Sequence, residues 1–377
     1  MKIGINTFAC EGGKSGVGVY IMQLLKRIPP SGALYELFGW EEDRFVYSEV
    51  APDLEFIPRY PLGGRNGPKL WHLFKYPQFA RDRAYDACFF PAAHKQLPYK
   101  SPCPTVGVVH DMAAYGGFEQ TGNAWVGLIR RILPNAIRRL DRVIAVSNWV
   151  KQQLMELAKV KESHIEVIPN GIDHAAFYPR PRNEESVVLI QPFSFRRPYI
   201  LYASRLEYPL KNHVRLIKAF GLFKERTKYP HRLVLAGGDQ RGAEQIKAAA
   251  AASPFRHDIF FTGHFPPKHI PELYAGADIV VIPSVHEGFG MGALEAMASG
   301  VPVACARAGS LPETAEHAAL YFDPYKPEDM ADRMVTLTTN REVYRECRRL
   351  GLERAGAFSW DRCATRTLDI LQETSGR

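Results

Sequence analysis

Two glutamates, Glu287 and Glu295, are the residues whose type and spacing best suit chemistry; seven residues separate them in the sequence HEGFGMGALEAMASGVP. The preceding run, Ala277–Pro283, is short, apolar and rich in β-branched residues, which is typical of a buried parallel strand. Gly288–Gly290 provides a flexible turn, and Met291–Ser299 consists mainly of strong helix formers. In an α/β sheet, such a strand, turn and helix present a ligand site at the carboxyl end of the strand. We therefore expect Glu287 at the end of the strand and Glu295 about one turn into the helix.

Two carboxylates that flank a helix start are suited to bind a sugar or a nucleotide. Free backbone N–H groups at the start of the helix favour phosphates or hydroxyl groups. Carboxylates accept hydrogen bonds from hydroxyl groups more strongly than neutral acceptors do. The alternative is an amphipathic helix whose glutamates face water. A Gly-Phe-Gly sequence is, however, an unfavourable choice for a turn that has only a structural role.

The segment around Glu287 and Glu295 resembles the retaining family 4 glycosyltransferases of the GT-B superfamily, whose signature is a glutamate pair around a Gly-Phe-Gly turn. The resemblance extends from the first strand to the last helix, and it implies an α/β fold of two Rossmann-like, doubly wound parallel-sheet domains that face a central cleft. It also implies that Glu287 holds hydroxyl groups of the donor sugar and that Glu295 contacts the ribose. A glycosidase-type acid/base pair is the alternative role for two carboxylates. The resemblance instead implies front-face substitution, in which the leaving phosphate oxygen takes the acceptor's proton.

A second candidate motif is Ser204–His213 (SRLEYPLKNH), which follows an expected strand. Arg205 and Lys211 match the paired cations that bind the donor diphosphate in the family. Negative charge builds up on a nucleoside diphosphate as the glycosidic bond breaks, and fixed cations stabilise it; losing one such contact typically costs about 2.7–4 kcal/mol of barrier. The alternative is that Arg205 and Lys211 are two surface cations on a loop with no role in binding.

The loop after the first strand, Glu11–Tyr20 (EGGKSGVGVY), is rich in glycine. Gly16 and Gly18 allow the backbone to approach a ligand, but the dinucleotide fingerprint is incomplete because Ile21 occupies the place of its third glycine. By resemblance, this loop lies over the donor diphosphate and the acceptor entrance.

His110 and Asp111 follow the expected strand Thr105–Val109. They match a His-Asp pair of the family, in which the histidine contacts the transferred sugar. We expect His110 to have a positioning and electrostatic role, with a neutral imidazole that donates a hydrogen bond to a sugar hydroxyl. Asp111 either orients His110 or caps the following segment.

The full set of expected site residues combines these motifs. Four residues are expected to be catalytic: His110, Glu287, Arg205 and Lys211. The residues expected to bind the donor are Gly16, Gly18, Arg205, Lys211, Gly263, Phe289, Gly290 and Glu295. No metal ligands are expected, because the sequence lacks an Asp-x-Asp pair, an HExxH motif and a Cys/His cluster. The nucleotide-sugar donor is expected as a co-substrate, with no separate cofactor.

Composition and charge restrict the class of protein. The chain has 377 residues, of which 46% are hydrophobic and 23% charged, and a formal net charge of +8. Its widely spaced cysteines favour a reduced, cytoplasmic compartment.

The segment 129–140 is basic. It would form a helix that Pro134 kinks or divides, and one half of its surface would be covered by Arg130, Arg131, Arg138 and Arg139. This half is either a solvated surface or a peripheral contact with anionic lipids at the inner face of the membrane. Nucleic acid is not expected as a partner, because no basic stripe is interleaved with aromatic residues.

Strand-like runs alternate with helical segments along the chain, which indicates doubly wound parallel sheets. The alternation breaks in a stretch rich in proline and charge. We expect an N-terminal acceptor-side domain over 1–180, a linker over 181–198 and a donor-binding domain over 199–357. By resemblance, a helix within 358–377 returns to the N-terminal domain, with Trp360 as a packing anchor.

The sequence therefore predicts a metal-independent, retaining hexosyltransferase. The expected donor is GDP-mannose, with UDP-hexoses as the alternative, and the expected acceptor is a glycan or lipid-linked oligosaccharide of polysaccharide biosynthesis. A nucleotide-sugar epimerase of the same architecture and a non-catalytic sugar-nucleotide sensor are further alternatives.

Overall fold

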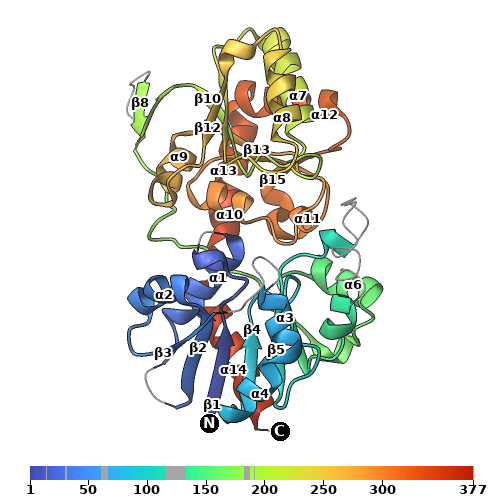
Figure 1. Cartoon of the computed structure of the whole chain (residues 1–377). Coiled ribbons are helices and arrows are strands. Elements are labelled where there is room, and N and C mark those ends of the chain that lie inside the picture. Colours follow the sequence, from blue (N-terminus) through green and yellow to red (C-terminus); the bar gives the residue numbers. More distant parts are fainter. Residues whose placement is uncertain are drawn as a thin grey trace. The chain divides into compact units, whose positions relative to one another are not determined.

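Strands and helices alternate throughout the chain, as the apolar runs of the sequence predict (Figure 1). The computed structural model describes residues 1–13, 15–29, 32–60, 67–115, 132–181, 187–190 and 192–376. The chain divides into a first unit, Met1–Gly171 with Ser359–Arg377, and a second unit, Ile172–Phe358.

The first unit contains a seven-stranded parallel sheet with the order β3-β2-β1-β4-β5-β6-β7. Its strands are β1 (Lys2–Asn6), β2 (Leu34–Trp40), β3 (Glu55–Arg59), β4 (Ala87–Phe90), β5 (Thr105–Val109), β6 (Arg142–Ala145) and β7 (Ile165–Val167). The central strands are buried along their whole length because helices cover both faces, as is usual for parallel sheets.

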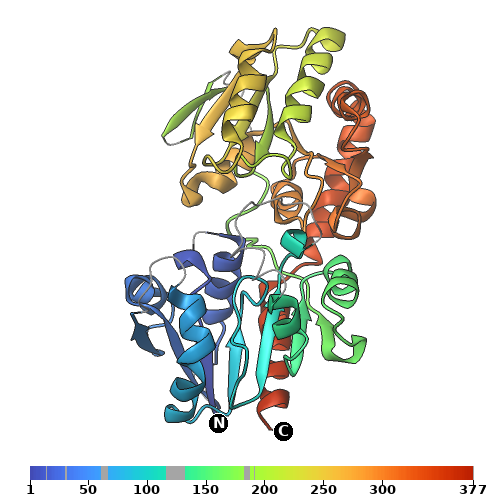
Figure 2. The ribbon, with the colours of Figure 1, turned by 45° about the vertical axis from the view of Figure 1, so that its right-hand side comes forward.

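The helices of the first unit whose bounds lie within the described residues are α1 (Gly16–Leu25), α2 (Arg44–Val50), α3 (Gly67–Phe74), α4 (Tyr76–Asp82), α6 (Asn148–Leu157) and α14 (Trp360–Ser375). Short 3-10 turns are η1 (Glu11–Gly13), η2 (Glu41–Asp43), η4 (Ala113–Tyr115) and η5 (Glu162–His164). Helix α14 packs on α1 and on strands β4, β5 and β6, and α3 and α4 lie on the opposite face (Figures 1 and 2).

The second unit contains a six-stranded parallel sheet with the order β12-β11-β10-β13-β14-β15. Its strands are β10 (Tyr199–Ala203), β11 (Arg232–Ala236), β12 (Ile259–Gly263), β13 (Ile279–Ile282), β14 (Val303–Ala306) and β15 (Ala319–Phe322). The helices are α7 (His213–Thr227), α8 (Ala243–Ala251), α9 (Ile270–Gly276), α10 (Met291–Ala298), α11 (Leu311–Ala315), α12 (Pro327–Thr339) and α13 (Arg341–Gly356). Its 3-10 turns are η6 (Arg256–Asp258), η7 (Pro267–His269) and η8 (Glu316–Ala318).

The division of the chain differs from the boundaries expected at 180, 198 and 357. The first change of unit falls at Gly171, where a methyl group would lie 2.1 Å from the backbone nitrogen of Trp360. The segment 181–198, expected as a linker, contains β8 (Val187–Ile190) and β9 (Phe193–Arg196), which pair antiparallel. Residues 182–186 and 191 of this segment lie outside the described residues.

Trp360 occupies the position that its expected packing role requires. It is 4% exposed, and its ring makes an edge contact with Tyr20 of α1 at a centroid distance of 6.1 Å. Along the same helix, the Thr367 hydroxyl hydrogen-bonds the Tyr20 hydroxyl at 3.1 Å. Helix α14 is therefore part of the core of the first unit.

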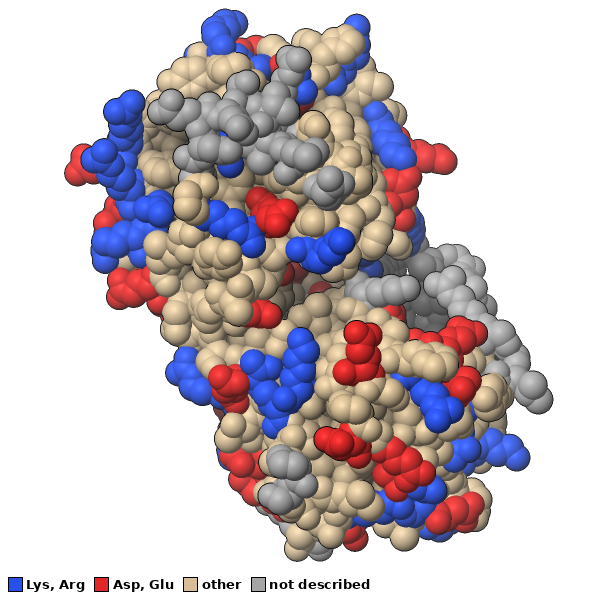
Figure 3. Space-filling model, turned by 90° about the vertical axis from the view of Figure 1, so that its left-hand side faces the viewer, with Lys and Arg blue, Asp and Glu red and all other residues tan. Residues whose placement is uncertain are grey.

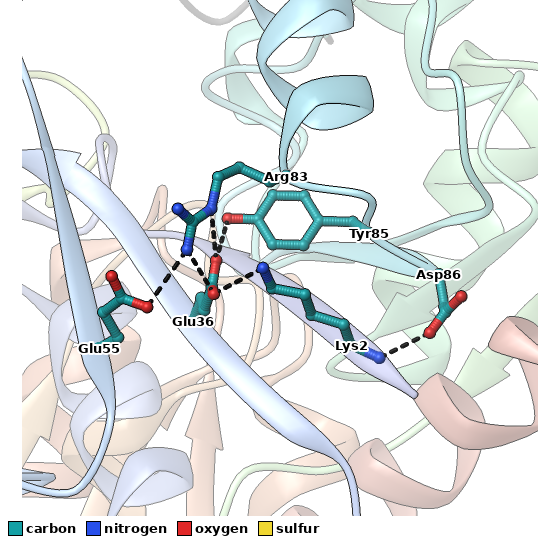
Figure 4. Close-up of polar contacts among 6 residues, drawn as sticks. All are labelled: Lys2, Glu36, Glu55, Arg83, Tyr85 and Asp86. Carbon is teal, nitrogen blue, oxygen red and sulfur yellow. Dashed lines mark hydrogen bonds and ion pairs between the residues drawn. The ribbon is translucent and has the colours of Figure 1, made fainter.

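A buried carboxylate joins the amino-terminal ends of strands in the first unit (Figure 4). Glu36 is 1% exposed, yet it pairs with Arg83 at 2.5 Å and with Lys2 at 2.8 Å, and it accepts a hydrogen bond from Tyr85 at 3.0 Å. Burial alone would raise the pKa of Glu36, but these three partners outweigh burial and lower the pKa. Because ligands of such sheets bind at the carboxyl ends of the strands, this cluster is structural.

The basic charge is spread over the surface rather than confined to one segment. On the face drawn in Figure 3, Lys and Arg side chains are interspersed with Asp and Glu over both units. Of the basic segment 129–140, Arg130 and Arg131 lie outside the described residues, and residues 132–137 are helical through Pro134. Arg138 and Arg139 are exposed, and the Arg139 guanidinium lies over the Tyr99 ring at 4.1 Å. In the described parts of the chain, every helix is too short or too polar to cross a membrane.

Candidate functional site

The candidate site of the second unit is formed at the carboxyl ends of β10 and β13. Lys211 lies in the loop between β10 and α7, and Glu287 lies between β13 and α10. Their side chains meet in an ion pair of 2.6 Å, with 18% and 20% of the side chains exposed. The two residues are 76 positions apart in sequence, and the parallel pairing of β10 with β13 brings the two loops to the same edge.

The backbone of Glu287 is fixed by the turn that precedes α11. The amide and the hydroxyl group of Ser310 both donate to the Glu287 carbonyl oxygen, each at 3.0 Å. Gly309, which adopts a φ of +60°, lies so close that an added methyl group would be 2.5 Å from the same oxygen. Only glycine fits this position, because it combines a left-handed conformation with a close backbone contact. The Glu287 carboxylate is thus presented from a rigid backbone.

Helix α10 begins where the sequence predicts and carries the second glutamate. Gly290 is its N-cap with a φ of 91° and no side-chain cap, which leaves the first N–H groups of the helix available to a ligand. Phe289 is 6% exposed, and its carbonyl oxygen accepts a hydrogen bond from the Thr314 hydroxyl. The Gly-Phe-Gly turn is therefore anchored on its inner side.

Glu295 carries a carboxyl group whose pKa is far from its ordinary value. Burial raises its pKa to about 7, and a hydrogen bond from the Tyr274 hydroxyl acts in the opposite direction. Such a carboxylate accepts hydrogen bonds from hydroxyl groups when ionised, and it becomes a donor when protonated. A raised pKa of this kind is common at functional sites. The sequence did not point to Tyr274, since a tyrosine near the end of α9 carries no motif.

The cations Arg205 and Lys211 do not lie in equivalent environments. Arg205 is 60% exposed, and its guanidinium is 3.6 Å from Glu207. The Tyr202 hydroxyl and the Ser284 hydroxyl hydrogen-bond at 2.8 Å, and burial raises the pKa of Tyr202 to about 12 although the charge of Lys211 lowers it. Lys211 is thus held in place by Glu287, whereas Arg205 extends into solvent.

Gly263 ends β12 with a φ of +66°, and a methyl group added there would meet nothing within 4 Å. Its left-handed turn therefore leaves open space beside the backbone. Asn212 shapes the turn before α7: it has a φ of 57°, and its side-chain amide donates to the carbonyl oxygens of Pro283 and Pro324 at 2.9 and 2.7 Å.

In the first unit, the glycine-rich loop leads into α1. Ser15 caps the helix by accepting a hydrogen bond from the Gly18 amide at 3.2 Å. A methyl group on Gly18 would lie 2.5 Å from the backbone of Gly13, so Gly18 is required by packing of the helix on its own loop. A methyl group on Gly16 would meet nothing within 4 Å. Gly16 thus remains the position at which a ligand could approach the backbone.

His110 lies at the carboxyl end of β5, as expected, and one of its two ring nitrogens has a partner within the protein. Its Nε2 donates to the Pro91 carbonyl oxygen at 2.9 Å, because a carbonyl oxygen can only accept. Burial lowers the pKa of His110 to about 4, so the ring is neutral near pH 7 and its Nδ1 carries a lone pair. A neutral His110 has one N–H group, and that group, Nε2–H, already donates to Pro91, while Nδ1 is an acceptor. The expectation that neutral His110 donates a hydrogen bond to a sugar hydroxyl is therefore wrong. The ring also packs edge-on against Tyr20 at 5.0 Å.

Asp111 caps the segment after β5. Its Oδ1 accepts a hydrogen bond from the Ala113 amide, which agrees with the second of its two expected roles. Within the described residues, no group of three or more His, Cys, Asp or Glu side chains lies together in a way that could hold a metal ion.

Comparison with known proteins identifies the family. Residues 14–176 match the family model "Glycosyltransferase Family 4", and residues 190–354 match "Glycosyl transferases group 1". The O-antigen chain mannosyltransferase B of Escherichia coli is 26% identical and is covered over its full length, with 99% of this chain aligned. The mannosylfructose-phosphate synthase of Agrobacterium fabrum is 28% identical over 95% of this chain and 86% of that protein.

A solved structure extends the comparison to the fold. HepE of Anabaena in complex with UDP-glucose superposes with a TM-score of 0.75 at 20% identity, over 99% of this chain and 100% of that chain. The two family models together span both units, and the sheets described above are those of the GT-B type. The chain therefore belongs to the family 4 glycosyltransferases of the GT-B superfamily, and it is a sugar-transferring enzyme.

Proposed function

We propose that this enzyme transfers mannose from GDP-mannose to a glycan or lipid-linked oligosaccharide, with retention of configuration and without a metal ion. The observation that carries the proposal is the ion pair of 2.6 Å between Lys211 and Glu287 at the carboxyl ends of β10 and β13. It places a fixed cation and a fixed carboxylate side by side, as a diphosphate leaving group and a hydroxyl-rich sugar require.

Lys211 and Glu287 would have separate tasks in the reaction. The Lys211 ammonium group would stabilise the charge that develops on the leaving diphosphate, with the N–H groups at the start of α10. The Glu287 carboxylate would accept hydrogen bonds from hydroxyl groups of the donor sugar. Ionised Glu295 would accept hydrogen bonds from the ribose, and in front-face substitution the leaving phosphate oxygen would take the acceptor's proton.

The choice of mannose is supported by relatives whose names contain it, and the two described above are both at or below 28% identity. A UDP-hexose donor is the second candidate, because HepE has been solved with UDP-glucose. A thermal-shift titration with GDP, GDP-mannose, UDP and UDP-glucose in the presence of EDTA separates the two. A ligand at 100 times its Kd should stabilise the fold by about 2.7 kcal/mol. Selective stabilisation by UDP-glucose would show that the donor is a UDP-hexose and not GDP-mannose. Stabilisation that requires a divalent ion would contradict metal independence.

The variant Glu287→Ala tests the site itself. Without its carboxylate partner, Lys211 retains its charge and attracts a diphosphate at least as strongly as before, while the sugar hydroxyls lose their acceptor. We therefore expect unchanged or tighter binding of the nucleoside diphosphate together with loss of transfer.

Glu346→Ala is the matched control, because Glu346 is an exposed carboxylate that also pairs with a cation, Arg349. It should behave as the wild type in both assays. Normal turnover by Glu287→Ala would refute the assignment of this site. Retention is measured separately, from the anomeric configuration of the first product by NMR.

A further inference from the structure

A second concave site lies within the second unit, and none of its lining residues belongs to the candidate active site. It is a cavity of about 590 Å³ between the segment 179–181, the ends of α9 and α10, and the first half of α13. Its polar lining residues are Arg180, Ser299, Arg341, Tyr344, Arg345 and Arg348.

The spacing of residues on α13 creates one wall of this cavity. Arg341, Tyr344, Arg345 and Arg348 follow one another at intervals of three, one and three residues. On an α-helix, these positions lie on one face, so three guanidinium groups and one aromatic ring point the same way. Arg180, from the segment 179–181, adds a fourth guanidinium to the lining.

The cationic charge of the cavity is not compensated by acidic side chains. The lining contains no aspartate or glutamate, and none of the four arginines forms an ion pair with the described residues. Arg348 Nε donates to the Gly300 carbonyl oxygen at 3.1 Å, which leaves its charge unneutralised. Arg349, the next residue on α13, does not line the cavity, and its guanidinium pairs with Glu346 at 2.6 Å and Glu353 at 3.2 Å.

Two buried donors of the lining also lack partners in the described structure. The Ser299 hydroxyl and one terminal nitrogen of Arg180 have no hydrogen-bond partner, and Ser299 is only 3% exposed. A buried polar atom without a partner is costly and is rare in native folds. An anion in the cavity would accept hydrogen bonds from both.

We propose that this cavity is a second anion site, which binds a molecule carrying two linked phosphate groups. The planar guanidinium fork matches phosphate oxygens in pairs, so arginine is favoured for such recognition. Four guanidinium groups exceed the charge of a single phosphate and match that of a diphosphate. The site goes beyond the transfer reaction and does not depend on the donor proposed above.

The position of the cavity gives its occupation a consequence for the active site. Ser299 and Gly300 directly follow α10, and Ala275 directly follows Tyr274, which donates to Glu295. A bound diphosphate would therefore contact both elements that hold Glu295.

The test uses inorganic pyrophosphate and isothermal calorimetry on the full chain. Because the donor site would also attract pyrophosphate, the measurement is made in the background Arg205→Ala/Lys211→Ala. Binding should remain in this background and should weaken by about tenfold or more for each of Arg341→Gln and Arg345→Gln, since each removes charge-assisted hydrogen bonds.

Arg349→Gln is the matched control, because it removes the same charge from the neighbouring position of α13, and it should leave the affinity unchanged. Absence of binding in the background, or equal binding by all three glutamine variants, would overturn the proposal. Thermal unfolding of each variant separates loss of the site from loss of the fold.

A second arm of the experiment identifies the source of the two phosphate groups. Co-sedimentation compares phosphatidylcholine vesicles with and without cardiolipin, whose headgroup carries two phosphodiester groups bridged by glycerol. Cardiolipin-dependent binding that Arg341→Gln/Arg345→Gln abolishes would assign the site to a lipid headgroup. Pyrophosphate binding without cardiolipin-dependent sedimentation would assign it to a soluble phosphorylated molecule.

Discussion

Replacing Glu295 by glutamine should make the enzyme more stable at neutral and alkaline pH. Burial raises the pKa of Glu295 to about 7, whereas the carboxyl group is near its ordinary pKa of about 4.5 in the unfolded chain. Between these values the folded state binds more protons than the unfolded state, so the free energy of unfolding falls as the pH rises. Above pH 7, Glu295 is ionised in the folded state too, and the loss of unfolding free energy caused by its burial reaches its full value.

The size of this effect follows from the difference between the two pKa values. A shift from 4.5 to about 7 is roughly 2.5 pH units, and each unit corresponds to about 1.36 kcal/mol, which gives about 3 kcal/mol. Glutamine keeps the shape of the side chain and still accepts a hydrogen bond from the Tyr274 hydroxyl. Glu295→Gln should therefore gain up to about 3 kcal/mol of unfolding free energy at pH 8 relative to the wild type.

Urea denaturation of wild type and Glu295→Gln at pH 8 and at pH 5 measures the effect. The advantage of the variant should shrink to a small fraction at pH 5, where the folded wild type already carries a protonated Glu295. A variant that is no more stable at pH 8, or one whose advantage is the same at both pH values, would refute the reasoning. The stabilised variant should also bind the donor nucleotide more weakly, because it has lost the ionised acceptor proposed for the ribose.

Three further outcomes are expected. Gly309→Ala should abolish transfer and cost about 1–3 kcal/mol of stability, since its methyl group would lie 2.5 Å from a carbonyl oxygen at a φ of +60°; Gly356→Ala, at the end of α13 with nothing within 4 Å, should leave turnover unchanged and should not lower the unfolding temperature. The pH–rate profile should show no ionisation of His110 between about pH 6 and 7, because the pKa of this ring is lowered to about 4; a step there that disappears in His110→Ala would contradict this. Tyr274→Phe should raise the pKa of Glu295 further and move the weakening of nucleotide binding at low pH to a higher pH, which calorimetry over a pH series would detect.

The local pattern of the sequence predicts much of the fold. The strands after which His110 and Glu287 stand were expected within one or two residues of their observed bounds, and so was the helix that carries Glu295. These segments combine β-branched runs, glycine turns and helix formers, so local propensity and the tertiary fold agree.

Strand β2 shows why other elements escaped prediction. Its sequence, LYELFGW, has no β-branched residue and includes Glu36, which would ordinarily mark a solvent-facing position. The strand forms because Arg83, Lys2 and Tyr85 compensate the buried carboxylate. Those partners come from separate segments of the chain, so no local window of sequence contains the reason.

The geometry of the candidate site could be predicted only in part. The sequence nominated Lys211 and Glu287 individually, but their mutual ion pair depends on the pairing of β10 with β13. The acceptor character of His110 depends on a carbonyl oxygen 19 residues away. The role of Gly18 in packing depends on the path of the preceding loop. Each of these is a property of the folded chain.

Helix α14 has a consequence for how the protein is made. The first unit includes residues 359–377, whereas the second unit is one continuous stretch, Ile172–Phe358. During synthesis, the ribosome therefore releases every residue of the second unit before it releases the helix that the first unit needs for its core. Until then, the sheet of the first unit lacks α14 on one of its faces. The apolar side chains of that face are therefore exposed to other chains during synthesis. Chaperones would be expected to act on the older half of the polypeptide, and its folding to be the later event.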